Sequence, residues 1–413
     1  MTFNNAIHYI DNTLHVEAIA LTELAERSDT PTYIYSRARL LENYQKIYDA
    51  FQHLNIHIHY SAKANANLTL LRTLIEVGAG VDCVSGGEIF LALKAGADPA
   101  HIVFAGVGKT AHDMRYALEQ NIGWFNVENE AELQLLNDIA GSLGQENIKV
   151  ALRLNPEVTA NTHPHIATGH GAAKFGLTAE TVQRLFANPT DYPNLTFTGL
   201  HLHIGSQLGD VNGTVAAIEK ASELLTPFPQ LRTLNIGGGI PAHYLADQHL
   251  PSAQDFAQAL TPLLREYEVL LEPGRSIVAD AGLLITQVLY VKEQGGQRFV
   301  IVDAGMTELM RPALYNATHE IVPVRRSEGK LTPAQVVGPV CETTDVLGRD
   351  VLLPDVQAGD LLAILTAGAY GMVMASTYNA RPRPAEVWVE GEKAVIVRQR
   401  ETWDDLLLGL TEV

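Results

Sequence analysis

A lysine in the segment YSAKAN, residues 60–65, is the first residue of the chain whose surroundings suggest chemistry. Lys63 has small or apolar neighbours there. A lysine that is removed from water loses its proton more readily, so its neutral amine can form a Schiff base with a carbonyl compound. Most lysines are solvated, so Lys63 needs support from other parts of the chain.

Two further segments, GGG at 237–239 and EPGR at 272–275, add a phosphate-binding pattern. A glycine run lets backbone N–H groups approach phosphate oxygens, and Arg275 adds a guanidinium. A tight turn is the alternative explanation for the glycines alone. Glu272 extends the pattern, because a carboxylate facing a pyridine nitrogen keeps that nitrogen protonated and makes the ring an electron sink. Together with Lys63, these segments predict pyridoxal phosphate as the cofactor.

Histidines occur in patterns that could also indicate a metal. His201 and His203 lie two residues apart, so they share one face of a strand, and His203 is nearer its C-terminal end. Further histidines stand at His57, His59, His163, His165 and His170. No carboxylate or cysteine cluster completes a ligand set around any of them. We therefore predict no metal site.

These residues follow strands that alternate with helices between residues 31 and 280. The expected strands are Ile56–Ala62, Gly80–Val84, Ile102–Ala105, Trp124–Val127, Lys149–Leu154, Thr196–Ile204, Thr233–Ile236 and Val269–Leu271. The expected helices include Arg37–Phe51, Leu68–Val77, Gly86–Lys94, Ala111–Gln120 and Glu130–Ile139. This alternation predicts a parallel sheet, and the strand number and length match a (β/α)8 barrel, with a doubly wound open sheet as the competitor. In such barrels the functional residues lie at the C-terminal strand ends.

After residue 280 the pattern becomes mostly β. The expected strands there are Leu283–Lys292, Gln297–Val302, Ala334–Val337, Leu361–Leu365, Ala385–Val389 and Ala394–Arg398. We therefore expect an α/β protein with a barrel over 31–280 and a mostly β domain over 281–413. Residues 1–30 contain two short alternating segments, His8–Ile10 and Leu14–Val16, and are expected to join the β domain.

Composition limits the possible partners and compartment. The chain has 413 residues, 46% of them apolar, and a formal net charge of −18. The charge argues against nucleic acid or anionic membranes as partners. Cys83 and Cys341 cannot build a disulfide framework, and the N-terminus shows no signal-peptide pattern, so we expect a cytoplasmic protein. Residues 361–380 are uncharged but contain too many polar and helix-breaking residues for a membrane span.

The combined motifs resemble the fold-type III pyridoxal phosphate decarboxylases, which join an alanine racemase-like barrel to a β domain, and among them the diaminopimelate decarboxylase family. The resemblance covers nearly the whole chain. It implies that Lys63 carries the cofactor, His203 stacks on its ring, and Glu272 binds the pyridine nitrogen. The other cofactor-binding residues that it implies are Asp82, Arg153, Ser206, Gly237, Gly238, Gly239, Pro273, Gly274, Arg275 and Tyr370.

The β domain carries the more specific part of this resemblance. MRPALY at 310–315 is similar to the family's substrate-binding segment, which implies that Arg311 and Tyr315 contact a substrate carboxylate. GPVCE at 338–342 is similar to a segment that reaches the partner subunit's active site. It therefore implies a homodimer with shared active sites. AGAYG at 367–371 and NARPRP at 379–384 also match.

The resemblance implies decarboxylation of meso-2,6-diaminopimelate to L-lysine and CO2. Glu342, Arg275 and Tyr370 are then further substrate contacts, and Cys341 is a candidate proton donor. Catalysis is assigned to Lys63, His203 and Cys341. The family usually has Ser-Gly after the Cys-Glu pair, whereas this chain has Thr343-Thr344, and the loop 168–176 departs from the usual pattern. The alternatives are a related decarboxylase of ornithine or arginine and a non-catalytic PLP-binding regulatory protein.

Overall fold

The computed structural model describes residues 4–158, 169 and 174–411, and the chain divides into two compact units. One unit consists of Tyr44–Ala242 and His249–Ser276. The other consists of Met1–Asn43, His243–Gln248 and Ile277–Val413. The short segment 243–248 therefore leaves the first unit and belongs to the second.

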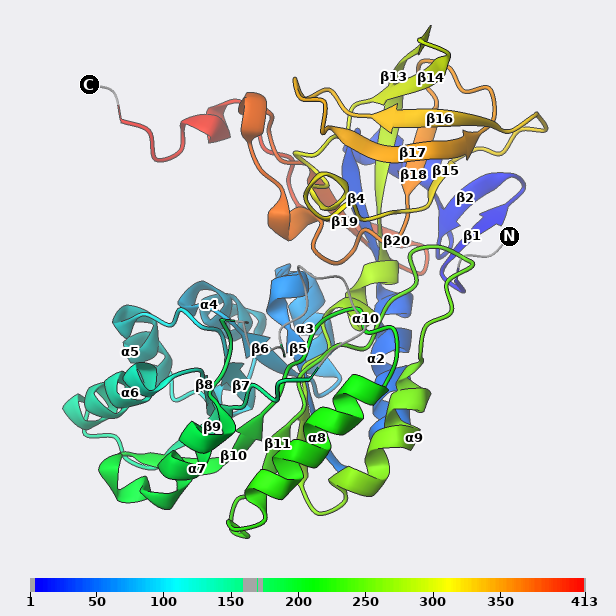
Figure 1. Ribbon diagram of the computed structural model, residues 1–413. Helices are drawn as coiled ribbons and strands as arrows, with labels where there is room; N and C mark the ends of the chain where they lie inside the picture. Colours follow the sequence, from blue (N-terminus) through cyan, green and yellow to red (C-terminus); the bar gives the residue numbers. More distant parts are fainter. Residues whose placement is uncertain (1–3, 159–168, 170–173, 412–413) are drawn as a thin grey trace. The chain divides into compact units, whose positions relative to one another are not determined.

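The first unit is a closed parallel barrel, ordered β10-β11-β12-β5-β6-β7-β8-β9 (Figure 1). Its strands are β5 (Asn55–Ser61), β6 (Gly80–Cys83), β7 (Ile102–Phe104), β8 (Trp124–Val127), β9 (Ile148–Arg153), β10 (Leu195–His201), β11 (Thr233–Asn235) and β12 (Glu268–Leu271). The predicted barrel is confirmed, and the closure of the sheet excludes the doubly wound alternative. Because all strands run parallel, their C-terminal ends meet at one mouth.

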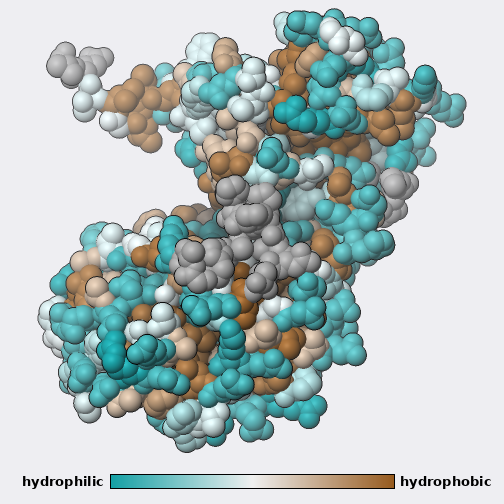
Figure 2. Space-filling view, in the orientation of Figure 1, coloured by the Kyte–Doolittle hydropathy of each residue, from teal (hydrophilic) through white to brown (hydrophobic). Residues whose placement is uncertain are grey.

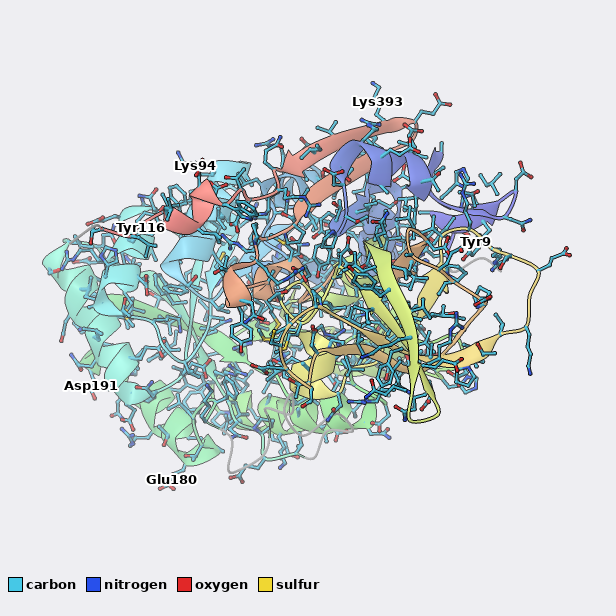
Figure 3. The ribbon with its side chains drawn as sticks, turned by 90° about the horizontal axis from the view of Figure 1, so that it is seen from above. Tyr9, Lys94, Tyr116, Glu180, Asp191 and Lys393 are labelled. Atoms are coloured by element: carbon cyan, nitrogen blue, oxygen red, sulfur yellow. The ribbon has the colours of Figure 1, made fainter. Side chains whose placement is uncertain are left out.

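Helices follow the strands around the barrel. They are α3 (Leu68–Glu76), α4 (Gly86–Ala95), α5 (Ala111–Glu119), α6 (Glu130–Ser142), α7 (Ala179–Ala187), α8 (Asn212–Leu225) and α9 (Ala253–Leu264). Many begin at a side chain that accepts a backbone N–H, as Ser85 does for α4 and Asn129 for α6. Exposed charged residues such as Lys94 and Glu180 point outward, away from the strands (Figure 3).

The second unit is built on a nine-stranded sheet. Its main path is β17-β16-β14-β13-β4-β19-β20, and β15 and β18 pair beside β13. The strands are β4 (Thr32–Ser36), β13 (Gly282–Gln294), β14 (Gln297–Val302), β15 (Ile321–Pro323), β16 (Thr332–Val337), β17 (Val346–Leu353), β18 (Leu361–Ile364), β19 (Ala385–Glu390) and β20 (Lys393–Arg398). The short helix α11 (Arg311–Tyr315) lies between β14 and β15 in the chain. The mostly β second domain is thereby confirmed.

The N-terminal segment forms a small sheet of its own, from β1 (Ile7–Ile10), β2 (Thr13–Val16) and β3 (Ile19–Ala20), followed by α1 (Leu21–Ser28). Leu14 and Leu21 share one apolar core with Ile285 of β13 and Val387 of β19. Burial of apolar surface in this common core holds the segment to the nine-stranded sheet.

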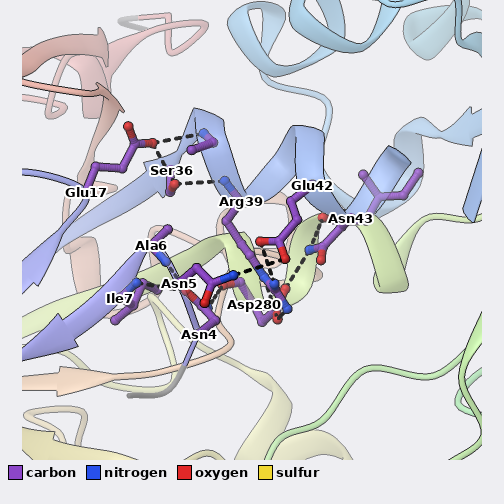
Figure 4. A network of polar contacts seen from close by, with 12 residues as sticks. Asn4, Asn5, Ala6, Ile7, Glu17, Ser36, Arg39, Glu42, Asn43 and Asp280 are labelled. Carbon is purple, nitrogen blue, oxygen red and sulfur yellow. Dashed lines mark hydrogen bonds and ion pairs between the residues drawn. The ribbon is translucent and has the colours of Figure 1, made fainter. Parts of the chain in front are cut away.

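Polar contacts connect the same segment to α2 (Arg37–Phe51) and to the chain after the barrel (Figure 4). The amide of Asn4 donates to the carbonyl of Asp280, and Asn43 donates to the Asp280 carboxylate at 2.7 Å. Arg39 binds that carboxylate through Nε at 3.0 Å and also pairs with Glu42. Asp280 thus links the entry and exit segments of the barrel within the second unit. The chain leaves the barrel through α10 (Arg275–Val278).

The expected elements differ from the observed ones at a few places. The predicted strand Thr196–Ile204 is too long at its C-terminal end, since β10 ends at His201. The strands β4, β15 and β17 were not predicted. In the uncharged stretch 361–380, only Leu361–Ile364 forms a strand, followed by turns and short 3-10 helices. Within the described residues, no helix has the length and apolar character needed to cross a membrane.

Candidate active site

Lys63 lies at the barrel mouth, in the single helical turn that follows β5. Its Nζ donates to Oδ2 of Asp82, near the end of β6, at 2.9 Å. The Lys63 side chain is 37% exposed, whereas that of Asp82 is fully buried. Ser61 Oγ donates to the same Asp82 oxygen at 2.6 Å. The amine is thus held in place from one side and accessible from the other.

Asp82 is under electrostatic strain at this position. Burial and the neighbouring Glu272 carboxylate raise its pKa, and Lys63 and Ser61 offset part of that effect. Its second oxygen, Oδ1, is buried and has no hydrogen-bond partner among the described residues. A buried carboxylate oxygen without a donor is costly, so the site favours a ligand that brings a donor or a positive charge.

Glu272 follows β12 and is held by groups from three other strands. Its Oε1 accepts from Asn235 at 2.6 Å and from Asn126 at 3.0 Å, and Oε2 lies 3.2 Å from Nε2 of His201. Burial by itself raises the pKa of Glu272, but His201, Lys63 and the Asn235 amide outweigh it and keep the pKa below its ordinary value. Glu272 is therefore ionised and fixed at neutral pH.

His203 and the glycine run after β11 form an adjoining wall. The N–H of Gly238 donates to Nδ1 of His203 at 3.2 Å, and the N–H of Gly237 donates to Asn235 at 2.9 Å. Burial, followed by the positive charges of Arg153 and Lys63, lowers the pKa of His203 well below its ordinary value. His203 therefore presents a neutral ring, with its Nδ1 already occupied as an acceptor.

The glycines at this turn are required by close approach. A Cβ at Gly238 would lie 2.5 Å from the carbonyl oxygen of Glu272, and one at Gly239, where φ is +106°, would lie 2.6 Å from Leu208. A residue with a side chain would therefore not fit at either position. Since Gly237 and Gly238 donate internally, their N–H groups shape the turn, and we expect phosphate donors to come from neighbouring groups instead.

Arg275 and Arg153 bring two guanidinium groups to the barrel mouth. Arg275 is buried, and its Nε donates to Ser206 Oγ at 3.2 Å. Arg153, the last residue of β9, pairs with the buried Glu128 at 2.6 Å. Its guanidinium also lies over the ring of Phe175, 4.6 Å from the centroid. Pro273 and Gly274 form the turn before Arg275, where a Cβ on Gly274 would lie 2.9 Å from Ser61.

In the β unit, Arg311 and Tyr315 begin and end α11. Arg311 is 7% exposed, its Nη1 lies 2.8 Å from Nε2 of His319, and its guanidinium lies over the ring of Tyr244. Tyr315, on the same short helix, is partly exposed. The structure thus places the two predicted carboxylate-binding residues on one element.

Cys341 and Glu342 lie in the loop between β16 and β17. The backbone of this loop is held by Asp345, which accepts from the N–H of Val340 at 2.7 Å and from that of Met306 at 2.6 Å. The Glu342 carboxylate accepts from the hydroxyls of Tyr378 and Thr344. Thr344, which departs from the family's usual pattern, therefore contacts a predicted substrate-binding residue. Cys341 is an exposed free thiol.

Tyr370 lies in the tight turn that follows β18. The turn is pinned by the N–H of Ala367, which donates to the carbonyl of Gly282, and by the N–H of Gly368, which donates to that of Ala279. Tyr370 has φ of +56°, a conformation that non-glycine residues adopt rarely. The turn is therefore held in a strained shape that sets the direction of the tyrosine side chain.

The histidines considered for a metal have other surroundings. His57 pairs with Glu268 at 3.3 Å, and His59 is buried edge-on against the ring of Trp124. Burial lowers the pKa of His59 to about 4, so it is a neutral core residue. Within the described part of the chain, no group of three or more potential ligands is close enough to hold a metal ion. His163, His165, His170 and most of the loop 168–176 lie outside the described residues.

Sequence reasoning missed the residues that hold the predicted ones. Asn126, Asn235 and Glu128 stand near or just beyond strand ends, where a barrel's functional residues are expected, so their position was the signal that could have found them. His201 was noticed, but its pairing with Glu272 was not. The contacts of His319 and Tyr244 with Arg311 could not be predicted, because no motif in the sequence near either residue indicates them.

Comparison with known proteins decides the family. Residues 37–279, more than half of the chain, match the model of the pyridoxal-dependent decarboxylase, pyridoxal binding domain. Diaminopimelate decarboxylase from Aquifex aeolicus is 44% identical over 408 residues, covering 97% of this chain and 96% of that protein. The chain belongs to the diaminopimelate decarboxylases, a family of pyridoxal-dependent decarboxylases.

Solved structures of this family agree with that assignment. The diaminopimelate decarboxylase from Helicobacter pylori, complexed with L-lysine, is 40% identical, with a TM-score of 0.90 over 94% of this chain and 98% of that one. The enzyme from M. jannaschii, also in complex with L-lysine, is 36% identical, with a TM-score of 0.94 over 100% and 99% of the two chains. The predictions of a pyridoxal phosphate enzyme and of a decarboxylase are confirmed.

Proposed function

We propose that this chain removes one carboxylate of meso-2,6-diaminopimelate as CO2 and releases L-lysine, the last step of lysine biosynthesis. The chain belongs to the diaminopimelate decarboxylases, and one observation at its barrel mouth carries the proposal. There an accessible amine, Lys63, lies beside two buried carboxylates, Asp82 and Glu272. Family membership supplies the substrate, and these three groups supply the charges that the reaction needs.

The barrel mouth fits pyridoxal phosphate in charge and shape. Asp82 has a buried oxygen that lacks a donor, and Glu272 is held ionised where a protonated ring nitrogen is its natural partner. The glycine turn leaves no room for side chains. This turn and Arg275 follow the last two barrel strands, where a phosphate is commonly bound, and Arg275 contacts Ser206. When bound, pyridoxal phosphate supplies an electron-withdrawing ring that accepts the electron pair left after CO2 departs.

The barrel residues then have distinct roles. Lys63 would hold the cofactor through its amine. Glu272 would hold a proton at the ring nitrogen, and His203 would contribute a neutral ring beside the cofactor. Arg275 and Ser206 would bind the phosphate, for which the glycine turn leaves room, and Arg153, whose charge is balanced by Glu128, would line the pocket.

The β-domain residues bind the substrate and supply a proton. Arg311, Tyr315 and Glu342 bind the distal L-end, while Arg275 and Tyr370 contact both cofactor and substrate. Breaking the bond to the D-centre carboxylate leaves the electron pair on that carbon, and a proton restores its fourth bond. We assign that proton to Sγ of Cys341. The products are one CO2 and one L-lysine for each diaminopimelate.

Incubation of the purified protein with meso-diaminopimelate tests the proposal directly. We expect CO2 and L-lysine in equal amounts. A protein that binds pyridoxal phosphate but forms neither product would instead be a non-catalytic, regulatory member of the family. Turnover of ornithine or arginine in place of diaminopimelate would support a related decarboxylase.

Substrate choice should depend on the distal carboxylate. Arg311 is buried, so a bidentate carboxylate pair there is well shielded from water, and each charge-assisted hydrogen bond contributes roughly 1.5–3 kcal/mol. A substrate without that carboxylate should lose about 3–5 kcal/mol, or about a few hundred-fold or more in kcat/KM. We therefore expect lysine, ornithine and arginine to be very poor substrates beside meso-diaminopimelate in a direct comparison of kcat/KM.

Arg311→Ala provides the matching variant. It should reduce the use of diaminopimelate far more than any residual use of lysine. Similar kcat/KM values for ornithine and diaminopimelate in the unmodified protein would contradict the substrate assignment and leave only the broader decarboxylase activity.

We also infer that two copies of the chain form a homodimer in the cytoplasm and share their active sites. The loop with Cys341 and Glu342 is exposed, as expected for a segment that serves a partner. The C-terminal segment also carries exposed apolar side chains, among them Trp403, 81% exposed, and Leu408, 88% exposed. Figure 2 shows hydrophobic residues gathered near the C-terminus. Exposed apolar clusters mark interaction surfaces. The two free cysteines agree with a reducing compartment.

Mixing two inactive variants tests the shared site. Lys63→Ala and Glu342→Ala proteins should each be nearly inactive. After subunit exchange, mixed dimers should regain activity, because one of their two sites contains both an intact Lys63 and an intact Glu342. If exchange is proven by mass spectrometry and activity does not return, each chain completes its own site.

A further inference from the structure

Arg311 is held from two directions by side chains that have no assigned role. Nε2 of His319 lies 2.8 Å from Nη1 of Arg311, and the guanidinium carbon lies over the ring of Tyr244, 4.5 Å from the ring centroid. The two rings are 90° to each other and 5.2 Å apart between centroids. Arg311, His319 and Tyr244 are all buried, with exposed fractions of 7%, 3% and 6%. Together they form a cradle, which we define as His319 and Tyr244 around Arg311.

The hydrogen bonds of His319 determine its protonation. A guanidinium can only donate, so Nε2 of His319 must accept from Arg311. Its other nitrogen, Nδ1, lies 2.9 Å from the carbonyl oxygen of Leu365 and therefore carries the proton. These two contacts require the neutral imidazole with its proton on Nδ1.

The backbone around the cradle is anchored in the sheet. The N–H of Leu365 donates to the carbonyl of Glu320, next to His319, at 2.9 Å, and Ile321 pairs with Ile364 between β15 and β18. Tyr244 is anchored by Gln248, which accepts from its N–H at 2.8 Å. The backbone that carries each ring is thus held by hydrogen bonds that do not involve Arg311.

Such a cradle has a specific effect on a guanidinium. The five N–H donors of arginine lie in one plane, so a hydrogen bond to one of them and an aromatic ring beside the guanidinium carbon together restrict how that plane can turn. A carboxylate can make two parallel hydrogen bonds to arginine only from directions within that plane. Fixing the plane in advance also reduces the entropy that is lost when the carboxylate binds.

We propose that His319 and Tyr244 are positioning residues that aim Arg311 at the distal carboxylate of the substrate, and so set the preference for a substrate with two carboxylates. This inference rests on the proposed function. His319 and Tyr244 act through Arg311 and do not touch the reacting atoms, so their effect should appear in substrate binding and selectivity, with the chemical step largely preserved.

The test uses paired variants in the full-length, cofactor-loaded protein. His319→Leu removes the acceptor, whereas His319→Gln keeps an oxygen that can accept from Arg311. Tyr244→Leu removes the ring under the guanidinium, and Tyr244→Phe keeps it. His112→Leu, at an exposed position on α5, is the matched control. Steady-state kcat and KM are measured for each, with cofactor content from absorbance and folding from thermal unfolding.

We expect His319→Leu to raise KM for meso-diaminopimelate about 10- to 100-fold, the range for losing a hydrogen bond to a charged group. Its kcat should stay within about threefold, and its cofactor content should be unchanged. His319→Gln and Tyr244→Phe should recover most of the loss, and Tyr244→Leu should behave like His319→Leu. Adding His319→Leu to Arg311→Ala should cause no further loss beyond about twofold, since both act through the same guanidinium.

The outcomes separate this inference from the proposed function. Suppose that the unmodified protein turns over diaminopimelate and the His319→Leu protein is folded and loaded with cofactor. If KM of that variant is then unchanged, or if its kcat falls by as large a factor as its KM rises, the positioning role is wrong and the proposed function stands. Additive losses in the double variant would have the same meaning. If the unmodified protein does not act on diaminopimelate, the proposed function fails and this inference fails with it.

Discussion

Replacement of Lys63 by alanine is expected to abolish decarboxylation and the covalent attachment of the cofactor. Lys63 is the amine at the end of β5, oriented by Asp82 and accessible on its other side. It is the proposed attachment point of the cofactor, and a positioned proton-transferring side chain alone contributes about 10²–10⁴-fold. We therefore expect kcat to fall by about 10⁴-fold or more.

Borohydride reduction followed by peptide mass spectrometry measures the attachment. The unmodified protein, yellow as purified, should carry the reduced cofactor on Lys63, and the alanine variant should carry none. Lys94→Ala, an exposed change on α4, is the control. Lys109, a buried lysine of the barrel, is engaged by Glu132 at 2.7 Å and by two backbone carbonyls, so it should not replace Lys63. A reduced adduct on the Lys63→Ala protein would identify another lysine as the attachment site.

Replacement of Glu272 by glutamine is expected to have the next largest effect. Glutamine has nearly the same shape and can still accept from Asn126 and Asn235, but it carries no charge. A neutral side chain cannot hold a proton at the ring nitrogen, so the ring should accept electrons less well. Removing one preorganised electrostatic contact of this kind costs about 10²–10³-fold in kcat. We expect a loss in kcat within that range, with the cofactor still attached to Lys63.

Two measurements separate this effect from simple damage to the site. Cofactor content and the absorbance of the bound cofactor are compared between variants, and kcat is divided by that content. Glu272→Asp, which keeps the charge, should retain more activity than Glu272→Gln. If Glu272→Gln, at equal cofactor content, has a kcat within about threefold of the unmodified protein, Glu272 does not act through the charge at the ring nitrogen.

The local pattern of residues was sufficient to predict the barrel. Each of the eight expected strands overlaps a barrel strand of the structure, because each is a short apolar run bounded by turns and followed by a helix. The placement of Lys63 and Glu272 at the barrel mouth follows from the same pattern, since parallel strands bring their C-terminal ends together, whereas Asp82 was assigned from the family resemblance. The error at Thr196–Ile204 arose because Leu202 and Ile204 continue the alternation of polar and apolar residues beyond the end of β10 at His201.

Only the tertiary structure decided which groups hold these residues. The strand β4 precedes the barrel in the chain but pairs with β13 and β19 of the β sheet, a choice that depends on partners more than two hundred residues away. The contacts of Glu272 with Asn126, Asn235 and His201 depend on the register of strands that meet when the barrel closes. The cradle around Arg311 likewise joins a loop of the chain to a residue beside β15. Sequence periodicity reports which face of an element is buried, whereas hydrogen-bond partners between distant elements are selected by packing and register, so they could not be predicted from the local sequence.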